Sequence, residues 1–230
     1  MKPLVIIPAR GGSKRIPRKN IVDINGQPAL SILILKLKEM NLFEEIVVST
    51  SDEEISRIAI EHGAVVANRS TASLSNDVTP SEEVVRDFIF QNKLHNSEIP
   101  IICIYPLALL LTKESIQEAL SHLGKAPDKF VISAGKLPIN PLRHTFIMIN
   151  ESIEVLFPQN NEKRSQDLEA AFFDVGMFYL AYPKVWISKN EYWYNNNARV
   201  VIIPDESCID VDTEADLNKL KIKLAESEQN

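Results

Sequence analysis

Short apolar runs alternate with longer amphipathic stretches through the first 133 residues, and this alternation constrains the fold more than any other feature. The apolar runs have the length of buried strands, and the stretches between them carry apolar residues at the spacing of one helix face. Strands joined by helices in this way form a mainly parallel sheet that is covered on both faces. The sequence therefore predicts a three-layer α/β/α fold, with strands at 2–8, 45–49, 64–67, 100–104 and 130–133 and helices at 28–40, 51–62, 79–94 and 112–123.

Local signals set the expected ends of these helices. Ser51 and Glu54 form a capping-box pattern, and Thr79 and Glu82 form a second one. The hydroxyl group of the first residue in each pattern is expected to cap the helix. Gly124 is expected to end the helix at 112–123, because glycine readily adopts the conformation that follows many helices.

The pattern changes after residue 135. Residues 136–200 are richer in proline, asparagine and aromatic residues, and their expected strands are antiparallel. We interpret this stretch as a cap or dimer-forming excursion within a single domain that covers residues 1–230. Strands are expected again at 200–203 and 207–212, followed by a final helix at 213–225 whose leucines share one face.

Composition narrows the class of ligand. The chain has 230 residues, a formal net charge of −6 and a pI near 5.3, so it lacks the overall basic character of a nucleic-acid-binding protein. Its basic residues are instead concentrated locally, which favours a small anionic ligand over a polymer. We therefore expect no nucleic-acid partner.

The sequence also indicates the compartment. No apolar run approaches the roughly 20 residues that span a bilayer, and no signal peptide is recognisable near the first residue. The cysteines, Cys103 and Cys208, are too few and too far apart for a disulfide framework or a zinc site. We expect a reduced, cytoplasmic protein with no membrane partner.

A basic loop follows the first expected strand, in the stretch IIPARGGSKRIPRKNI at residues 6–21. Loops at the carboxyl end of such a strand border the ligand site of an open α/β sheet. The glycine pair allows backbone amides to face an anion, arginines bind phosphate oxygens in pairs, and lysines act as point charges. The five cations are Arg10, Lys14, Arg15, Arg18 and Lys19, around Gly11 and Gly12.

The loop matches neither of two common phosphate-binding patterns. It lacks the Gly-x-x-x-x-Gly-Lys-Ser/Thr pattern of the Walker loop and the Gly-x-Gly-x-x-Gly pattern of dinucleotide-binding proteins. Kinase and dehydrogenase functions therefore lose their main support. The competing interpretation is a solvated charge run without a ligand.

Several stretches resemble the acylneuraminate cytidylyltransferases, which activate nine-carbon α-keto acid sugars. PARGGSKRIPRKN resembles the family signature, VVSTSDEEI its second strand-helix junction, LSND its stretch near the cytosine, and IDVDTEADL its metal site and last helix. RSQDLEAAFFDVGMFY resembles the sugar-binding part of the pseudaminic acid branch. The resemblance implies a Rossmann-like nucleotidyltransferase fold, CTP as co-substrate, Mg²⁺ as cofactor and a homodimer formed through the excursion.

Two carboxylates stand near the end of the chain. In a strand, Asp210 and Asp212 would point to the same side, where they repel each other unless a cation or a donor lies between them. Mg²⁺ prefers one or two carboxylates together with water and phosphate oxygens. The resemblance also assigns this pair to the metal. The alternative is that Asp212 only caps the final helix.

The resemblance implies that CMP passes from CTP to the anomeric hydroxyl of the sugar acid. Arg10 and Lys19 match the catalytic basic positions of the family and would stabilise the charge that grows on pyrophosphate. Thr79 and Ser81 would approach the cytosine, although Ser81 could simply be an early helix residue. The expected nucleotide-binding residues are Ala9, Arg10, Gly11, Gly12, Ser13, Lys14, Arg15, Lys19, Asn20, Arg69, Thr79 and Ser81.

The sugar acid needs a cation for its carboxylate and polar groups for its substituents. The resemblance points to Arg143 and Arg164 for the charge. A surface ion pair or a buried tyrosine is the competing interpretation for each residue of this set. The expected sugar-binding residues are Tyr105, Arg143, Arg164, Gln166, Asp167 and Tyr179.

Two departures from the family pattern leave alternatives open. The polar turn that usually follows the fourth central strand reads Tyr105-Pro106-Leu107-Ala108-Leu109, and Ser51 replaces an acidic residue that is displaced to Asp52. Within the same class of enzyme, legionaminic acid, N-acetylneuraminic acid and an eight-carbon sugar acid are the alternative substrates. A catalytically silent nucleotide-binding homologue is the alternative from another functional class.

Overall fold

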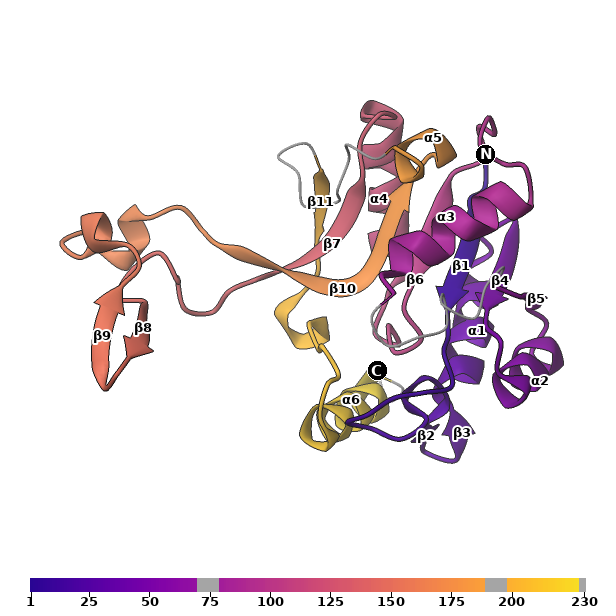
Figure 1. Cartoon of the computed structure of the whole chain (residues 1–230), viewed down its shortest axis with the longest axis horizontal. Coiled ribbons are helices and arrows are strands. Elements are labelled where there is room, and N and C mark those ends of the chain that lie inside the picture. Colours follow the sequence, from indigo (N-terminus) through magenta and orange to yellow (C-terminus); the bar gives the residue numbers. More distant parts are fainter. Residues whose placement is uncertain (70–78, 189–197, 228–230) are drawn as a thin grey trace.

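The computed structural model describes residues 1–69, 79–188 and 198–227. Its centre is a seven-stranded sheet in the order β11-β7-β10-β6-β1-β4-β5 (Figure 1). The strands are β1 (Leu4–Pro8), β4 (Glu45–Ser49), β5 (Val65–Ala67), β6 (Ile101–Ile104), β7 (Val131–Lys136), β10 (Phe172–Ala181) and β11 (Arg199–Ile202).

The sheet is mainly parallel, as predicted. Strand β1 pairs in parallel with β4 and β6, β4 with β5, and β7 with β11. Strand β10 runs antiparallel between β6 and β7. Because β10 lies within the expected excursion at 136–200, the part of the chain that leaves the sheet is shorter than expected.

Helices cover both faces of this sheet. Alternate residues of β1 point to opposite faces, so Val5 and Ile7 belong to one apolar cluster and Leu4 and Ile6 to the other. The first cluster includes α1 (Ala29–Met40), α2 (Glu53–Glu61), α4 (Lys113–Lys125) and α6 (Glu214–Ser227); the second includes α3 (Ser81–Gln91) and α5 (Pro183–Trp186). The three-layer architecture is therefore confirmed.

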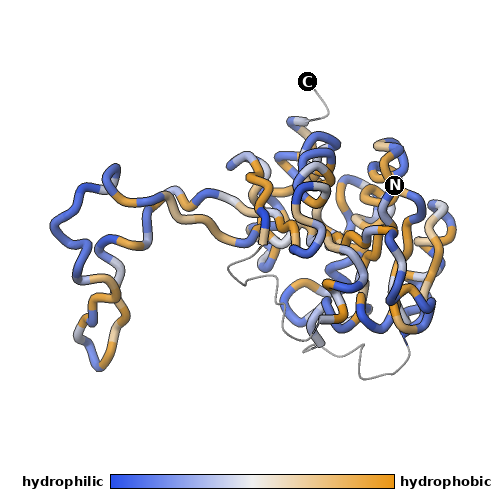
Figure 2. The backbone as a smooth tube through the Cα atoms, turned by 90° about the horizontal axis from the view of Figure 1, so that it is seen from above, coloured by the Kyte–Doolittle hydropathy of each residue, from blue (hydrophilic) through white to orange (hydrophobic). Residues whose placement is uncertain are grey.

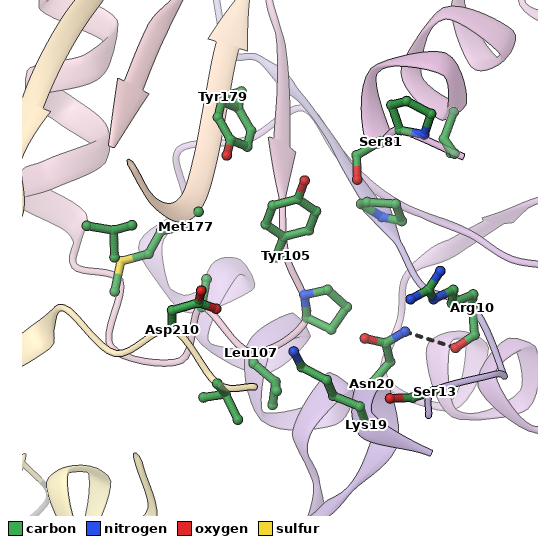
Figure 3. A pocket seen from close by; sticks show the side chains of 18 of the residues that line it. Arg10, Ser13, Lys19, Asn20, Ser81, Tyr105, Leu107, Met177, Tyr179 and Asp210 are labelled. Atoms are coloured by element: carbon green, nitrogen blue, oxygen red, sulfur yellow. Dashed lines mark hydrogen bonds between the residues drawn. The ribbon is translucent and has the colours of Figure 1, made fainter. Parts of the chain in front are cut away.

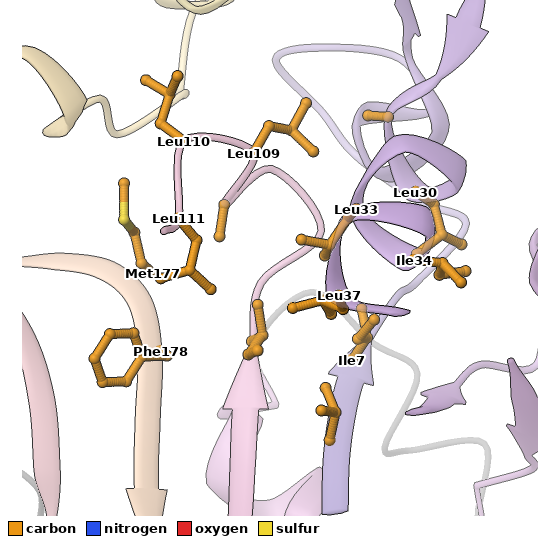
Figure 4. Close-up of a cluster of buried hydrophobic side chains, with 14 of the residues drawn as sticks. Ile7, Leu30, Leu33, Ile34, Leu37, Leu109, Leu110, Leu111, Met177 and Phe178 are labelled. Atoms are coloured by element: carbon orange, nitrogen blue, oxygen red, sulfur yellow. The ribbon is translucent and has the colours of Figure 1, made fainter. Parts of the chain in front are cut away.

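Helix α1 shows how the periodic pattern becomes a core. Leu30, Leu33, Ile34 and Leu37 are fully buried against β1 and its neighbours (Figure 4). The burial of each such side chain is worth roughly 1.5–3 kcal/mol relative to an exposed position. The same cluster reaches the turn after β6 and the middle of β10, so it supports the strand ends on which a ligand site can be built.

Two of the expected helix starts were wrong. Helix α2 is capped by Asp52 rather than Ser51, because the Asp52 carboxylate accepts a hydrogen bond from the Ile55 amide at 3.0 Å. Helix α3 begins at Ser81, and its N-cap residue is Pro80 rather than Thr79. Proline already has the backbone angle that a helix entry needs.

Two further expectations near the ends of elements also failed. Helix α4 continues through Gly124 to Lys125, because Gly124 lacks the positive φ of a helix stop. The strand expected at 207–212 is absent; a 3-10 helix, η5 (Asp205–Ser207), is followed by irregular chain up to α6. The final helix itself is confirmed, and its buried residues are Leu217, Leu220 and Leu224.

A projecting arm leaves the body between β7 and β10 (Figure 1). It carries the antiparallel hairpin of β8 (Phe146–Ile149) and β9 (Ser152–Val155), followed by the short 3-10 helices η3 (Pro158–Asn160) and η4 (Ser165–Asp167). The expected antiparallel character of this region is confirmed. Figure 2 shows hydrophobic residues along the hairpin, far from the main core.

A small hairpin of β2 (Asp23–Ile24) and β3 (Gln27–Pro28) connects the basic loop to α1. The loop itself ends in the 3-10 helix η1 (Lys19–Ile21). None of the helices in the described ranges is both long and apolar enough to cross a membrane.

Candidate active site

A cleft of about 590 Å³ opens beyond the carboxyl ends of β1 and β6 (Figure 3). Ligands of open α/β sheets bind at this edge, because loops that follow parallel strands meet there. Six segments contribute to the cleft: the basic loop, the chain after β5, the start of α3, the turn after β6, the bend of β10 and the chain before α6. The predicted residues that line it are Arg10, Gly12, Ser13, Lys19, Asn20, Arg69, Thr79, Ser81, Tyr105, Tyr179 and Asp210.

The basic loop is held at both ends. The Asn20 side chain donates a hydrogen bond to the Arg10 carbonyl oxygen at 2.9 Å, which ties the end of the loop to its beginning (Figure 3). Ile16, between the basic residues, is buried in the main core. These anchors allow Arg10 and Lys19 to face the cleft from a fixed backbone.

Arg69 brings a second guanidinium group to the wall that carries Arg10. It donates a hydrogen bond to the Ser49 carbonyl oxygen at 3.1 Å. Burial lowers the pKa of Arg69 from its ordinary value, and the charge of Arg10 lowers it further. Two cations that raise each other's energy in this way create a favourable place for an anion.

Asp212 joins the far end of the chain to the basic loop. One carboxylate oxygen accepts a hydrogen bond from Lys19 Nζ at 3.3 Å, and the other lies 2.8 Å from Arg15 Nη1. The residue precedes α6, whose cap is Thr213: the Thr213 hydroxyl oxygen accepts a hydrogen bond from the Asp216 amide at 3.3 Å. The alternative that Asp212 only caps the helix is therefore contradicted.

Asp210 lies on the cleft wall, two residues before Asp212. Partial burial raises the pKa of its carboxyl group above the ordinary value, the charge of Asp212 raises it further, and Lys19 opposes the rise. Among the described residues its carboxylate has neither a hydrogen-bond partner nor an ion-pair partner. The two carboxylates come together although the expected strand at 207–212 is absent.

A cation that uses few protein ligands fits this pair. The described residues contain no group of three or more His, Cys, Asp or Glu side chains that could hold a metal ion. Mg²⁺ binds through one or two carboxylates and completes its shell with water and substrate phosphates. Asp210 and Asp212 could supply the two carboxylates, and a phosphate held by the adjacent basic loop could supply the remaining oxygen ligands.

The bend of β10 supplies cleft residues that the sequence analysis missed. Asp174 accepts a hydrogen bond from the Tyr179 hydroxyl at 2.5 Å and another from the Gly176 amide at 2.8 Å. Gly176 has a φ of 68°, and the pairing register shifts between Asp174 and Tyr179. A glycine beside an acidic residue inside an apolar run is a typical sign of a bulge and could have identified this site.

Tyr105 packs edge-on against Tyr179, with ring centroids 5.9 Å apart. Leu107 and Ala108, from the apolar turn that departs from the family pattern, also line the cleft. The turn is therefore a wall of the candidate site, and its polar contacts are replaced by apolar surface.

Four of the expected sugar-binding residues lie on the projecting arm and do not line the cleft. Arg164 forms an exposed pair with Asp167, at 2.8 Å from Nε and 3.0 Å from Nη2, and Gln166 lies between them in η4. Arg143 donates a hydrogen bond to Ser165 at 3.4 Å beside a separate hollow on the arm. The chain brings together Tyr105 and Tyr179 but leaves these four apart from them.

Four expected nucleotide-binding residues stand next to the cleft without lining it: Ala9, Gly11, Lys14 and Arg15. Ala9 is buried and donates its amide to the Ser49 carbonyl oxygen at 3.0 Å. Arg15 is 67 % exposed while it contacts Asp212. The stretch LSND, at 74–77, lies outside the described residues.

Comparisons with known proteins identify the family. The sequence profile of the family described as "Cytidylyltransferase" matches residues 4–214. The pseudaminic acid cytidylyltransferase of Campylobacter jejuni is 34% identical over 226 residues, which cover 96% of each chain. The CMP-N,N'-diacetyllegionaminic acid synthase of Legionella pneumophila is 30% identical over 144 residues, which cover 61% of each chain.

A solved structure supports the fold. It is that of a CMP:2-keto-3-deoxy-manno-octonic acid synthetase complexed with CTP, which superposes with a TM-score of 0.71 at 17% identity and covers 99% of this chain and 100% of its own. The profile match extends from the first strand to the beginning of the last helix and so includes both sides of the cleft. The chain therefore belongs to the cytidylyltransferase family.

Proposed function

We propose that this protein transfers CMP from CTP to the anomeric hydroxyl group of a nine-carbon α-keto acid sugar, with pseudaminic acid preferred. The observation that carries the proposal is the contact of Lys19 with Asp212, which joins the basic loop to a carboxylate pair at the edge of one cleft. The product would be a CMP-activated sugar for surface glycans or flagellin.

The cationic end of the cleft would hold the triphosphate. Arg10, Lys19 and Arg69 would contact its oxygens, and the polar groups of Thr79 and Ser81 would lie near the base. The sugar hydroxyl oxygen forms a bond to the α-phosphorus and gives its proton to solvent, and the bond to the bridging oxygen of the β-phosphate breaks. Pyrophosphate leaves with that electron pair, and Arg10 and Lys19 stabilise its charge.

Asp210 and Asp212 would hold Mg²⁺, with Asp212 exchanging its contacts to Arg15 and Lys19 for the metal. The bound ion would neutralise charge on the α-phosphate and lower the pKa of the attacking hydroxyl group. The exchange would also free the two cations to contact the nucleotide.

The preference for pseudaminic acid is supported by the similarity to the Campylobacter jejuni enzyme over 96% of this chain. N-acetylneuraminic acid and legionaminic acid are the alternatives. The test is pyrophosphate release with CTP and each sugar acid in turn. Faster turnover with pseudaminic acid is expected, and equal or faster turnover with N-acetylneuraminic acid would overturn the preference.

The same assay distinguishes a catalytically silent homologue. Such a protein would bind CTP in a calorimetric titration but release no pyrophosphate with any sugar acid. Arg10, Lys19 and Asp210 line one cleft and Asp212 contacts Lys19 beside it, which supports an active enzyme. The proposed setting is the cytoplasm, where CTP is available and both cysteines stay reduced.

The proposed enzyme is a homodimer that pairs through the projecting arm. Met148 and Ile153 are directly opposite each other in the β8–β9 hairpin and are 75% and 61% exposed. Exposed apolar side chains grouped on an extended hairpin are typical of a surface that another chain covers. A second copy would also explain why Arg143 and Arg164, on the same arm, lie away from the cleft of their own chain.

Sedimentation of a Met148→Asp/Ile153→Asp variant tests this pairing. We expect a dimer for the parent protein and a monomer for the variant. Ile222→Asp is the matched control, because Ile222 is 59% exposed on α6, far along the chain from the hairpin. A parent protein that sediments as a monomer at micromolar concentration would refute the proposal.

A further inference from the structure

Arg18 forms ion pairs with Asp52 and Glu54 at the start of α2. We propose that Arg18 is a positioning residue that sets the direction in which Lys19 and Asn20 face the cleft. The effect of Arg18 on the rate of CMP transfer can be measured only if the proposed function is correct. Arg18 was one of the five cations of the basic loop, and it is not among the residues that line the cleft. Its role in this picture is to hold the loop rather than to contact the nucleotide.

The contacts of Arg18 all run to the amino-terminal end of α2. Nη1 lies 2.5 Å from Asp52 Oδ2, and Nη2 lies 2.9 Å from Asp52 Oδ1 and 2.6 Å from Glu54 Oε2. A guanidinium group that binds one carboxylate through two nitrogens has a defined orientation, unlike a lysine at the same place. The planar group is thereby fixed relative to α2.

Asp52 is itself held firmly enough to serve as an anchor. Its Oδ1 atom accepts a hydrogen bond from the Ile55 amide at 3.0 Å, and its amide donates to Thr50 Oγ1 at 3.1 Å. The hydrogen bond from Arg18 is the largest influence that lowers the pKa of Asp52, to about 2. The pair is therefore fully charged at any pH at which an enzyme of this kind would work.

The backbone of Arg18 links this anchor to the cleft. Its φ of 54° and ψ of 33° lie in the left-handed region, which is unfavourable for a residue with a side chain. Arg18 is also the residue from which η1 begins, and η1 carries Lys19 and Asn20. Without the grip of Asp52, the chain would relax toward ordinary angles and turn η1 away from its present direction.

The beginning of the basic loop, at Gly11, packs against the same Arg18–Asp52 ion pair. A side chain at Gly11 would collide with the Asp52 carboxylate and come within 3.0 Å of Arg18 Nη1. The loop backbone at Gly11 therefore lies directly against the ion pair. The beginning of the loop at Gly11 and its end at Arg18 are therefore both positioned by contact with Asp52.

The consequence should be kinetic more than thermodynamic. The side chains of Arg18 and Asp52 are 38% and 21% exposed, and partly exposed ion pairs contribute little to the free energy of unfolding. Misplacement of a charged group near a reacting phosphate, by contrast, reduces rates strongly. The Asp52 carboxylate also caps α2, and its charge can be removed without loss of the cap.

Asp52→Asn and Arg18→Gln are the test variants. Asparagine caps helices as well as aspartate does, so Asp52→Asn keeps the cap and removes the charge. Arg57→Gln is the control, because Arg57 forms an exposed two-contact pair with Glu61 of the same helix, at 2.9 and 3.2 Å, rather than with the basic loop. CTP affinity by calorimetry, steady-state kinetics and thermal melting are measured for all of them.

Each test variant is expected to weaken CTP binding about tenfold and to lower kcat by a similar factor, since a loosened loop misplaces Lys19. The KM for the sugar acid should match that of Arg57→Gln, and the melting temperature should fall only slightly below that of Arg57→Gln, because a partly exposed ion pair contributes little to the free energy of unfolding. The double variant Arg18→Gln/Asp52→Asn should lose no more than either single variant, because both remove one interaction. Arg18→Lys should recover part of the loss.

CTP affinity and kcat equal to those of Arg57→Gln would overturn the proposal, as would losses that add in the double variant. A change confined to the melting temperature would also overturn it. If the parent protein releases no pyrophosphate with any sugar acid, the proposed function fails while the calorimetric comparison still decides the role of Arg18.

Discussion

Lys19 Nζ lies 3.3 Å from Asp212 Oδ1, although 193 positions separate the two residues in the chain. Arg15 approaches the other oxygen of the same carboxylate at 2.8 Å. The basic loop and the carboxylates near the end of the chain therefore lie together, with Asp210 on the cleft wall and Asp212 in contact with the loop.

Asp212→Asn should abolish pyrophosphate release while the fold stays intact. The change removes a charge from the proposed Mg²⁺ site, and the loss should be on the order of 10² or more in kcat. Pyrophosphate release is measured across a Mg²⁺ titration, with circular dichroism as the check on folding. Asp205→Asn, an exposed carboxylate of η5, is the control. A near-normal rate for Asp212→Asn would remove the metal assignment.

Lys19→Met should lower kcat by about 10², the usual loss when a group that stabilises developing charge is removed. Methionine keeps the aliphatic length, so the change isolates the ammonium group. Lys223→Met is the control, because Lys223 is an exposed residue of α6 that pairs with Glu226 at 2.7 Å. The measurement is single-turnover CMP transfer. Equal rates for the two variants would mean that Lys19 does not act on the leaving group.

Asp52 should make stability depend on acid. Its folded-state pKa of about 2 lies below the ordinary value of 3.8, so its charged form stabilises the folded state above about pH 4. That contribution is lost as the pH falls from about 4 through 2. Urea unfolding at pH 5, 4, 3 and 2 is the measurement. The difference in midpoint between the parent protein and Asp52→Asn should shrink across this window, and a constant difference would contradict the assignment.

Trp186→Ala should cost about 3–5 kcal/mol in the free energy of unfolding, as expected for a large side chain removed from a core. Trp186 is fully buried, donates from Nε1 to the Ile101 carbonyl oxygen at 3.1 Å, and packs edge-on against Phe130 at 4.9 Å. Phe90→Ala, at a position that is 59% exposed on α3, should cost under about 1 kcal/mol. Urea titration compares them, and similar losses would contradict the burial.

Local pattern was sufficient for most of the architecture. The strands and the helix faces followed from residue periodicity, because burial on one side of an element imposes that periodicity on the sequence. The helix entries at Asp52 and Pro80 were misjudged, since neighbouring polar residues compete for a cap and the tertiary contact of Asp52 with Arg18 decided one of them. Element type was thus more predictable than element boundary.

The cleft was less predictable than the fold. Arg10, Lys19 and Asp210 stood in recognisable stretches, whereas Asp174 became a cleft residue only through the bend of β10 at Gly176. The reason for placing Asp210 and Asp212 together, a shared strand, was wrong even though both carboxylates face the basic loop. A sequence motif identifies the residue types, but the orientation of each side chain depends on the helices and strands around it.

The sequence by itself determined the alternation of strands and helices, the cationic loop and the acidic pair, because these are properties of neighbouring residues. Tertiary structure alone decided that Lys19 meets Asp212, that β10 enters the central sheet antiparallel, and that Arg143 and Arg164 stand on an arm away from the cleft. Those relationships join segments far apart in the chain. Their distances depend on how the layers pack around a common core, which no local pattern records.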